Sequence, residues 1–195
     1  MIKELVTKTR SYRRFDESTR IPFEVLEGLV DTVRGVASAA NRQPLKYVIV
    51  SKEEACEKLF EACTWAGALK DWGGPQPGER PTGYIVLLKD AELSMNDKFS
   101  AWDAGIAMQT IMLDAVEQGF GGCFIGAFNK GKCMEVIGLD PKRYRPQIVI
   151  ALGKPVEDCR VVGVPEDGST TYWRDEEQVH YVPKRNLDEV LVARL

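Results

Sequence analysis

The chain has 195 residues, long enough for one large domain with a sizeable hydrophobic core. Hydrophobic residues make up 44% of the chain and charged residues 28%, which is the balance of a soluble globular protein. The formal net charge is −3 and the calculated pI is about 5.4, so the composition argues against non-specific binding to nucleic acid.

The cysteines and the apolar stretches set further limits. There are 5 cysteines, an odd number with no pair at CxxC spacing, so we expect neither a disulfide framework nor a zinc site. This use of cysteine fits a reducing cytoplasm. The first residues are charged, and no apolar stretch reaches the roughly 18 residues of a membrane span. We therefore expect no signal peptide and no transmembrane segment.

The first half of the chain predicts two helices and two strands. Apolar residues recur every three or four positions in residues 22–36, with Pro22 in the first turn, which indicates an amphipathic helix. Ser51 and Glu54 have the spacing of a capping box and predict the start of a helix over residues 52–63. Apolar runs predict strands at residues 45–50 and 84–88.

Residues 95–119 predict the longest helix, which is apolar on two faces. One face carries Phe99, Trp102, Ile106, Leu113 and Val116, and the other carries Met108, Ile111, Met112 and Ala115. A helix that is apolar most of the way round is buried on several sides. In a chain of this size, we expect such a helix to be central and shared with a second subunit.

The second half predicts strands at residues 122–126 and 146–153, with a helix between them that ends near Gly138. Residues 156–180 are polar and predicted to be irregular, and residues 186–192 predict a short helix. The strands are separated by helices of varied length, without a regular βαβ rhythm. We therefore predict a single α+β domain over residues 1–195, with about four strands surrounded by helices.

Two common catalytic motifs are incomplete. Residues 126–133, GAFNKGKC, fit the GxxxxGK pattern of a phosphate-binding P-loop, but Cys133 stands where Ser or Thr must offer magnesium a hydroxyl. No later apolar strand ends in the aspartate that a nucleotide triphosphatase needs. The one histidine, His180, has no partners at triad or metal-ligand spacing, so we predict a surface or interface residue.

Two polar clusters point to a ligand. The segment KTRSYRRF, residues 8–15, gathers four cationic side chains in an acidic chain, which suggests a small anion, with a solvated helix end as the alternative. Asn41 and Gln43 lie in a tight loop before a strand, where their amides can read the edge of a heterocycle or simply form a polar connection. Arginines that bind a phosphate and amides that read a ring together describe a nucleotide-like cofactor.

Five segments, in this order and spacing, resemble the FMN-dependent nitroreductase family: RSYRRF (10–15), SAANRQP (38–44), DAGIAMQTIMLDAVEQGFGGCFIGAF (103–128), ALGKP (151–155) and VPKRNLDEVL (182–191). The resemblance implies a nitroreductase-like α+β fold, with a central, mostly antiparallel sheet of four to five strands surrounded by helices. It also implies a cytoplasmic, intertwined homodimer that binds FMN between its subunits, with residues 95–119 as the dimer-core helix and C-terminal segments that wrap the partner.

The resemblance also assigns cofactor-binding positions. Arg10, Ser11 and Arg13 match the phosphate and ribityl site, Asn41 and Gln43 the pyrimidine end, Ile125 and Gly126 the segment beside flavin N5, and Lys184 and Arg185 the basic pair that completes the phosphate site. No residue is implied as catalytic, because flavin N5 carries the chemistry, and Arg14 is expected to face solvent. Two choices stay open: Arg13 or Arg42 for stabilising the reduced flavin, and substrate stacking or core packing for Trp65 and Trp72.

The implied activity is a flavin oxidoreductase that passes a hydride from NADH or NADPH, through FMN, to a nitroaromatic, quinone or related small-molecule acceptor by a ping-pong mechanism. Two alternatives stay open: an enzyme of the same fold with dehalogenase-like or enoate reductase chemistry, and a flavin-binding protein without turnover. Neither nucleic acid nor a membrane is an expected partner.

Overall fold

The computed structural model describes residues 2–67, 69 and 72–195. It divides the chain into two compact units: unit 1 is Met1–Trp65 with Gly74–Val156, and unit 2 is Ala66–Gly73 with Glu157–Leu195. Each unit is described by itself below. The single domain over residues 1–195 stays a prediction.

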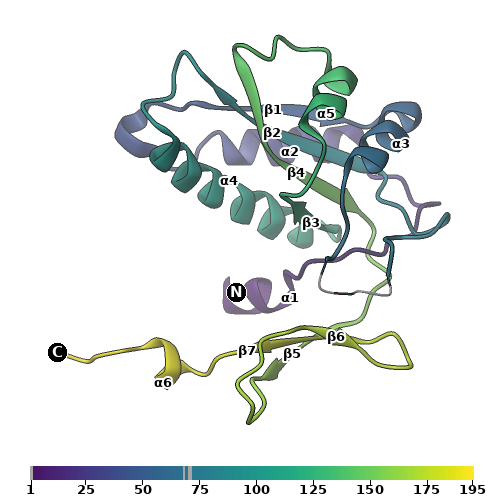
Figure 1. Cartoon of the computed structure of the whole chain (residues 1–195), viewed down its shortest axis with the longest axis vertical. Helices are drawn as coiled ribbons and strands as arrows, with labels where there is room; N and C mark the ends of the chain where they lie inside the picture. The colour runs from purple at the N-terminus through teal and green to yellow at the C-terminus, as the bar shows by residue number, and fades with distance from the viewer. Residues whose placement is uncertain (1, 68, 70–71) are drawn as a thin grey trace. The chain divides into compact units, whose positions relative to one another are not determined.

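Unit 1 is built around a four-stranded antiparallel sheet with the strand order β1-β2-β4-β3 (Figure 1). The strands are β1 (Leu45–Val50), β2 (Gly83–Asp90), β3 (Gly121–Ile125) and β4 (Tyr144–Gly153). Every residue of β2 is buried, because β2 has a strand on each side and helices over both faces. This position explains why residues 84–88 of the strand are a continuous apolar run with no polar alternation.

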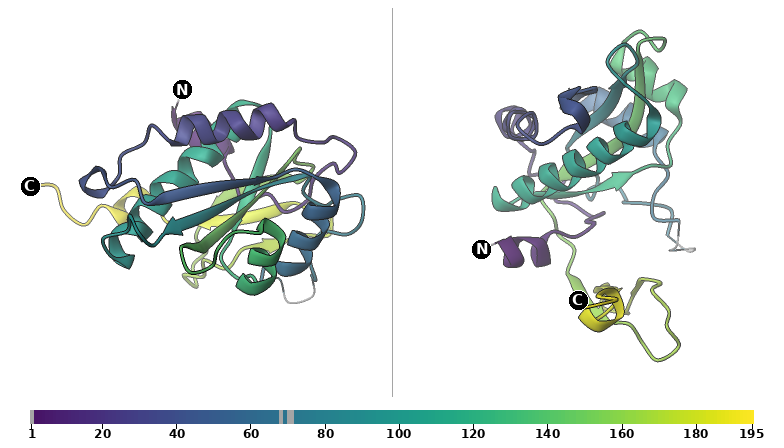
Figure 2. Two further views of the ribbon diagram at one scale, coloured as in Figure 1. Left: turned by 90° about the horizontal axis from the view of Figure 1, so that it is seen from above. Right: turned by 90° about the vertical axis from the view of Figure 1, so that its left-hand side faces the viewer.

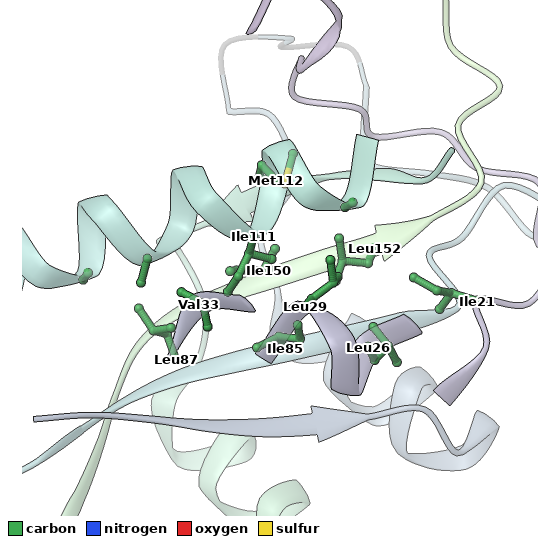
Figure 3. Close-up of a cluster of buried hydrophobic side chains, with 13 residues drawn as sticks. Ile21, Leu26, Leu29, Val33, Ile85, Leu87, Ile111, Met112, Ile150 and Leu152 are labelled. Carbon is green, nitrogen blue, oxygen red and sulfur yellow. The ribbon is translucent and has the colours of Figure 1, made fainter. Parts of the chain in front are cut away.

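Helices cover both faces of the sheet (Figure 2, left). Unit 1 contains α1 (Ile2–Lys8), α2 (Phe23–Val33), the 3₁₀ turn η1 (Ala39–Asn41), α3 (Glu53–Ala62), α4 (Asp97–Glu117) and α5 (Lys130–Ile137). The main core lies between the sheet and the pair α2 and α4, and Figure 3 shows its residues. It consists of Ile21, Leu26, Leu29, Val33, Ile85, Leu87, Ala104, Ala107, Ile111, Met112, Ala115, Ile150 and Leu152.

The long helix α4 buries one face within its own chain and leaves the other exposed. Ile111, Met112 and Ala115 face the core, whereas Trp102 is 53% exposed and Ile106 is 43% exposed. Within the single chain, α4 is therefore covered on one side only, and burial of its other side would need a second subunit. An apolar surface remains on this helix, and the expected second subunit stays a prediction.

Unit 2 contains a three-stranded sheet with the order β5-β7-β6. Its elements are β5 (Cys159–Gly163), β6 (Trp173–Arg174), β7 (His180–Lys184) and the short helix α6 (Leu187–Val190). The expectation that residues 156–180 are irregular is therefore wrong for β5 and β6, whereas residues 164–172 and 175–179 form neither helix nor strand. Only 1% of His180 is exposed, and its ring lies 5.1 Å from the Tyr172 ring, so the surface alternative is wrong and the interface alternative stays a prediction. Strand β7 turns this side chain inward.

One predicted helix start is wrong, and one helix end is confirmed. Helix α3 has Lys52 at its N-cap without a side-chain hydrogen bond, and Glu54 accepts a hydrogen bond from Lys58 at 2.7 Å in place of closing a capping box. Helix α5 ends at Gly138, whose φ of 67° is left-handed and suits glycine. Within the residues that the structure describes, no helix combines the length and the apolar character needed to cross a bilayer.

Candidate functional site

The N-terminal basic segment is joined to the start of β3. Ser11 forms a parallel bridge with Gly122, and the backbone N–H of Tyr12 donates to the Gly122 carbonyl at 2.9 Å. Glycine is needed here because a Cβ at residue 122 would lie 2.0 Å from the carbonyl oxygen of Ala151. From Gly122, strand β3 continues for three residues, or about 10 Å, and ends at Ile125. The fold thus aligns the basic segment with the strand that leads to Gly126.

Arg10 keeps unused hydrogen-bonding capacity. Its Nη2 donates to the carbonyl of Val6 at 2.7 Å, whereas its Nε is buried and finds no acceptor among the described residues. A buried donor without an acceptor costs free energy, and such groups call for an explanation. Arg13 lies nearby, half-buried, and its Nη1 donates to the Ser11 carbonyl at 3.2 Å, while Ser11 itself is exposed. This arrangement suits an anion that approaches the segment.

Arg14 does not face solvent as expected, because it forms an ion pair. Its Nε donates to both carboxylate oxygens of Glu79 at 3.0 Å, and the pair is partly buried. The backbone of the same residue accepts a hydrogen bond from the N–H of Val156 at 3.1 Å. Arg14 therefore anchors the basic segment to unit 1 and fixes the position of its neighbour Arg13.

The chain after β3 is held in place by backbone bonds. Ile125 is buried and Gly126 is exposed, while the next carbonyl, at Ala127, accepts from the N–H of Thr64 at 2.8 Å. Helix α5 begins at an ordinary N-cap, since the Asn129 side chain accepts from a backbone N–H of its first turn. Cys133 is buried and offers no hydroxyl at the position where a P-loop needs Ser or Thr.

The loop that carries the two amides has a strained backbone. Ala40, Asn41 and Gln43 have φ values of 49°, 50° and 49°, in the left-handed region that residues other than glycine rarely adopt. Each such residue costs roughly 1–2 kcal/mol. The Gln43 side chain also donates to Oδ1 of Asn41 at 3.1 Å, so the two amides lie together. Strain of this kind concentrates at functional sites, which favours the ligand interpretation of this loop.

A buried carboxylate on α4 holds this loop, and sequence reasoning missed it. Asp103 is 3% exposed and accepts hydrogen bonds from the Ser38 hydroxyl at 2.7 Å and from the Ala39 N–H at 2.9 Å. Burial raises the pKa of the nearby Tyr47 to about 12, with the charge of Asp103 contributing. The available signal was an acid placed on the core-facing side of an apolar helix.

The predicted site residues fall into three groups. Arg10, Ser11 and Arg13 belong to the segment that pairs through Ser11 with Gly122, near the start of β3, and this strand leads through Ile125 to Gly126. Asn41 and Gln43 precede β1, the opposite edge strand, three strand spacings or about 14 Å across the sheet. Lys184 and Arg185 belong to unit 2, where Arg185 lies 3.4 Å from Glu189. The convergence of these groups on one ligand stays a prediction.

The two tryptophans of the predicted pocket each have a partner in their own unit. Trp65 is 7% exposed, and its ring centroid lies 5.4 Å from that of Phe60 in unit 1. In unit 2, the Arg174 guanidinium lies 4.3 Å from the centre of the Trp72 ring. These contacts favour core packing over substrate stacking, most clearly for Trp65.

Comparison with known proteins identifies the family. The model of the Nitroreductase family matches residues 6–154, and the chain belongs to this family. A protein of Methanothermobacter thermautotrophicus, provisionally named NADH dehydrogenase/NAD(P)H nitroreductase, is 27% identical over 160 residues, which cover 80% of this chain and 78% of that protein.

Solved structures share the fold. One from Desulfovibrio desulfuricans, provisionally described as a nitroreductase and solved in complex with FMN, has a TM-score of 0.72 and 20% identity, covering 100% of this chain and 96% of that one. An enone reductase of gut-bacterial fatty acid saturation metabolism has a TM-score of 0.65 and 19% identity, covering 80% and 89% of the two chains. The predicted nitroreductase-like α+β fold with a central antiparallel sheet is therefore confirmed.

Proposed function

We propose that this chain is an FMN-dependent oxidoreductase that passes a hydride from NADH or NADPH to a nitroaromatic, quinone or related acceptor. The observation that carries the proposal is the pairing of the basic segment with β3, the strand that leads to Gly126, in a member of the Nitroreductase family. The printed names of relatives, which include NAD(P)H nitroreductase, and the FMN complex of the Desulfovibrio desulfuricans protein support it.

The residues of the chain fit this cofactor. Arg10 and Arg13 offer guanidinium groups to the phosphate, and the buried Nε of Arg10 finds no acceptor among the described residues. Gly126 is exposed and carries no side chain, so its backbone N–H can approach a planar ring closely. Asn41 and Gln43 supply the donors and acceptors that a pyrimidine edge requires. Bound FMN supplies hydride acceptance and donation at N5.

The protein side of the reaction is binding, orientation and electrostatics. The arginines neutralise the phosphate and fix the cofactor, and the strained amide loop orients one end of its ring. A cationic side chain, Arg13 or Arg42, stabilises negative charge on that ring. No acid or base from the protein is required, which agrees with the incomplete catalytic motifs of the sequence.

We infer that the site requires two copies of the chain. The Gly126 N–H follows β3 and the Asn41 and Gln43 amides precede β1, and these two edge strands lie about 14 Å apart across the sheet, whereas hydrogen bonds reach only about 3 Å. The ring system of one flavin can contact both Gly126 and the amide loop if one of these two parts comes from a second copy of the chain. The exposed Trp102 and Ile106 on α4 offer an apolar surface for such a homodimer.

A second candidate is an enoate reductase, because an enone reductase has the same fold. The electron acceptor distinguishes the two candidates. A nitro compound or quinone would reoxidise the reduced flavin of the first candidate. A compound with a carbon–carbon double bond conjugated to a carbonyl would reoxidise that of the enoate reductase. A flavin-binding protein without turnover is the third candidate.

The test is an absorbance spectrum of the purified protein, followed by anaerobic titration with NADH and with NADPH. We expect a yellow protein that either nucleotide bleaches and that a nitroaromatic or quinone reoxidises. Reoxidation by an enone alone would favour the second candidate, and bleaching by dithionite alone the third. Protein that binds no added FMN would contradict all three.

A further inference from the structure

We propose that Asp103 is a positioning residue that holds the loop Ser38–Gln43 in the conformation that binds the cofactor. This inference rests on the proposed function, because the loop carries Asn41 and Gln43. Asp103 lies on α4 and acts on the loop through hydrogen bonds.

The contacts form a relay from α4 to both ends of the loop. One carboxylate oxygen of Asp103 accepts from the Ser38 hydroxyl at 2.7 Å, and the other accepts from the Ala39 N–H at 2.9 Å. The Ser38 oxygen in turn accepts from the backbone N–H of Gln43 at 3.0 Å. Hydrogen bonds to an ionised carboxylate are stronger than those between neutral groups, so the relay can hold an unfavourable backbone.

Fold stability alone does not explain an acid at this position. Asp103 is 3% exposed, and in the described part of the chain no cation pairs with it. A buried carboxylate without a counter-ion costs solvation free energy, and apolar residues of similar size often serve a core as well or better. Its neighbours Ala104 and Ala107 on the same helix face the core with apolar side chains. Asp103 therefore serves the loop that it contacts.

The loop needs such an anchor because its backbone is strained. Ala40, Asn41 and Gln43 have left-handed φ values, which persist only where the surroundings impose them. A cavity of about 320 Å³, lined in part by Gln43, Tyr47 and Asp103, leaves the loop room to relax. Without the carboxylate, we expect the backbone to relax and the two amides to lose their joint orientation.

The experiment compares Asp103→Asn with wild-type protein in two measurements that do not use turnover. The first is the Kd of the apoprotein for FMN, from quenching of flavin fluorescence. The second is hydrogen exchange of the backbone N–H groups of Ala39 and Gln43 in the apoprotein. We expect FMN binding to weaken by about 10- to 100-fold, because an amide keeps only one acceptor for the two donors, and both N–H groups to exchange at least about tenfold faster.

Three further variants test whether a general loss of stability explains the result. Ser100→Ala removes a buried hydroxyl from the same helix, and this hydroxyl bonds only to Ser94 and Asn96 among the described residues. The substitution should change the Kd for FMN by less than about threefold. Ser38→Ala removes the loop side of the relay and should reproduce the effect of Asp103→Asn, whereas Ser38→Thr, which keeps a hydroxyl, should restore binding.

The outcomes separate this inference from the proposed function. Unchanged exchange and unchanged FMN affinity in Asp103→Asn and in Ser38→Ala would overturn the role of Asp103. Equal losses in Ser100→Ala would overturn it too, by showing a general effect of destabilisation. Wild-type protein that binds no FMN would refute the proposed function, and the exchange rates would then still decide whether Asp103 holds the loop.

Discussion

Replacing Arg10 by alanine should weaken FMN binding without a comparable loss of stability of the apoprotein. The substitution removes the hydrogen bond from Nη2 to the Val6 carbonyl at 2.7 Å, worth about 0.5–1.5 kcal/mol. It also removes the buried Nε that finds no acceptor in the described chain, which relieves about 1–3 kcal/mol of desolvation cost. These terms oppose each other, so the net effect on the free energy of unfolding should lie between a loss of about 0.5 kcal/mol and a gain of about 2.5 kcal/mol.

The cost to binding is larger, because the phosphate loses a charged partner. A hydrogen bond to a charged group contributes about 1.5–3 kcal/mol, and each 1.4 kcal/mol corresponds to about tenfold in Kd. We therefore expect Arg10→Ala to raise the Kd for FMN by about 10- to 150-fold. Together with Arg13→Ala, the loss should reach about 3–6 kcal/mol, at least about a hundredfold.

The assay titrates apoprotein with FMN by fluorescence and measures urea unfolding of the same samples. Arg34→Ala is the matched control, because Arg34 is exposed at the C-cap of α2 and pairs with Asp31. It should leave both measurements unchanged. The assignment of the phosphate site is wrong if Arg10→Ala binds FMN within about threefold of wild type, or if the control weakens binding equally.

Three further predictions concern stability and assembly. Gly122→Ala should destabilise the fold by about 2–4 kcal/mol in urea unfolding, because its Cβ would lie 2.0 Å from the Ala151 carbonyl oxygen; a smaller loss would mean that β3 can shift freely. Trp102→Lys should convert a dimer into a folded monomer in sedimentation experiments, and an unchanged dimer would place the interface elsewhere. Burial opposes ionisation of Asp90, but hydrogen bonds from Arg143 and a backbone N–H overcome it and lower its pKa. Its contribution to stability should therefore be complete above its unfolded pKa of about 3.9 and be lost as the pH falls through the folded value, and Asp90→Asn should remove this part of the acid dependence.

Most elements of unit 1 could be predicted because their patterns are local. The apolar run at residues 84–88 predicted β2, the 3.6-residue period of residues 22–36 predicted α2, and the two apolar faces of residues 95–119 predicted α4. Helix α1 and strands β5, β6 and β7 were missed because they are short, and periodicity carries little signal over so few residues. The burial of His180 follows from the pairing of β7 with β5, which no local pattern reveals.

In the candidate site too, local sequence patterns could be predicted and contacts between distant residues could not. The cations near Arg10 and the amide loop were visible in the sequence, whereas the contacts that position them join residues far apart in the chain. Ser38 and Asp103 are 65 positions apart, as are Arg14 and Glu79, and neither pair has a spacing that sequence rules recognise. The capping box failed for the opposite reason, because its short pattern also arises by chance.

The stability of helix α1 should depend on whether FMN is bound, so its proteolysis can report cofactor binding. None of its 7 residues is fully buried, and isolated helices shorter than about 12 residues are marginal in water. Its last turn leads directly into Arg10, whose guanidinium is bonded to the carbonyl of Val6. A phosphate held by Arg10 would damp fraying of this helix, so trypsin should cut after Lys3 and Lys8 more slowly as the protein fills with FMN.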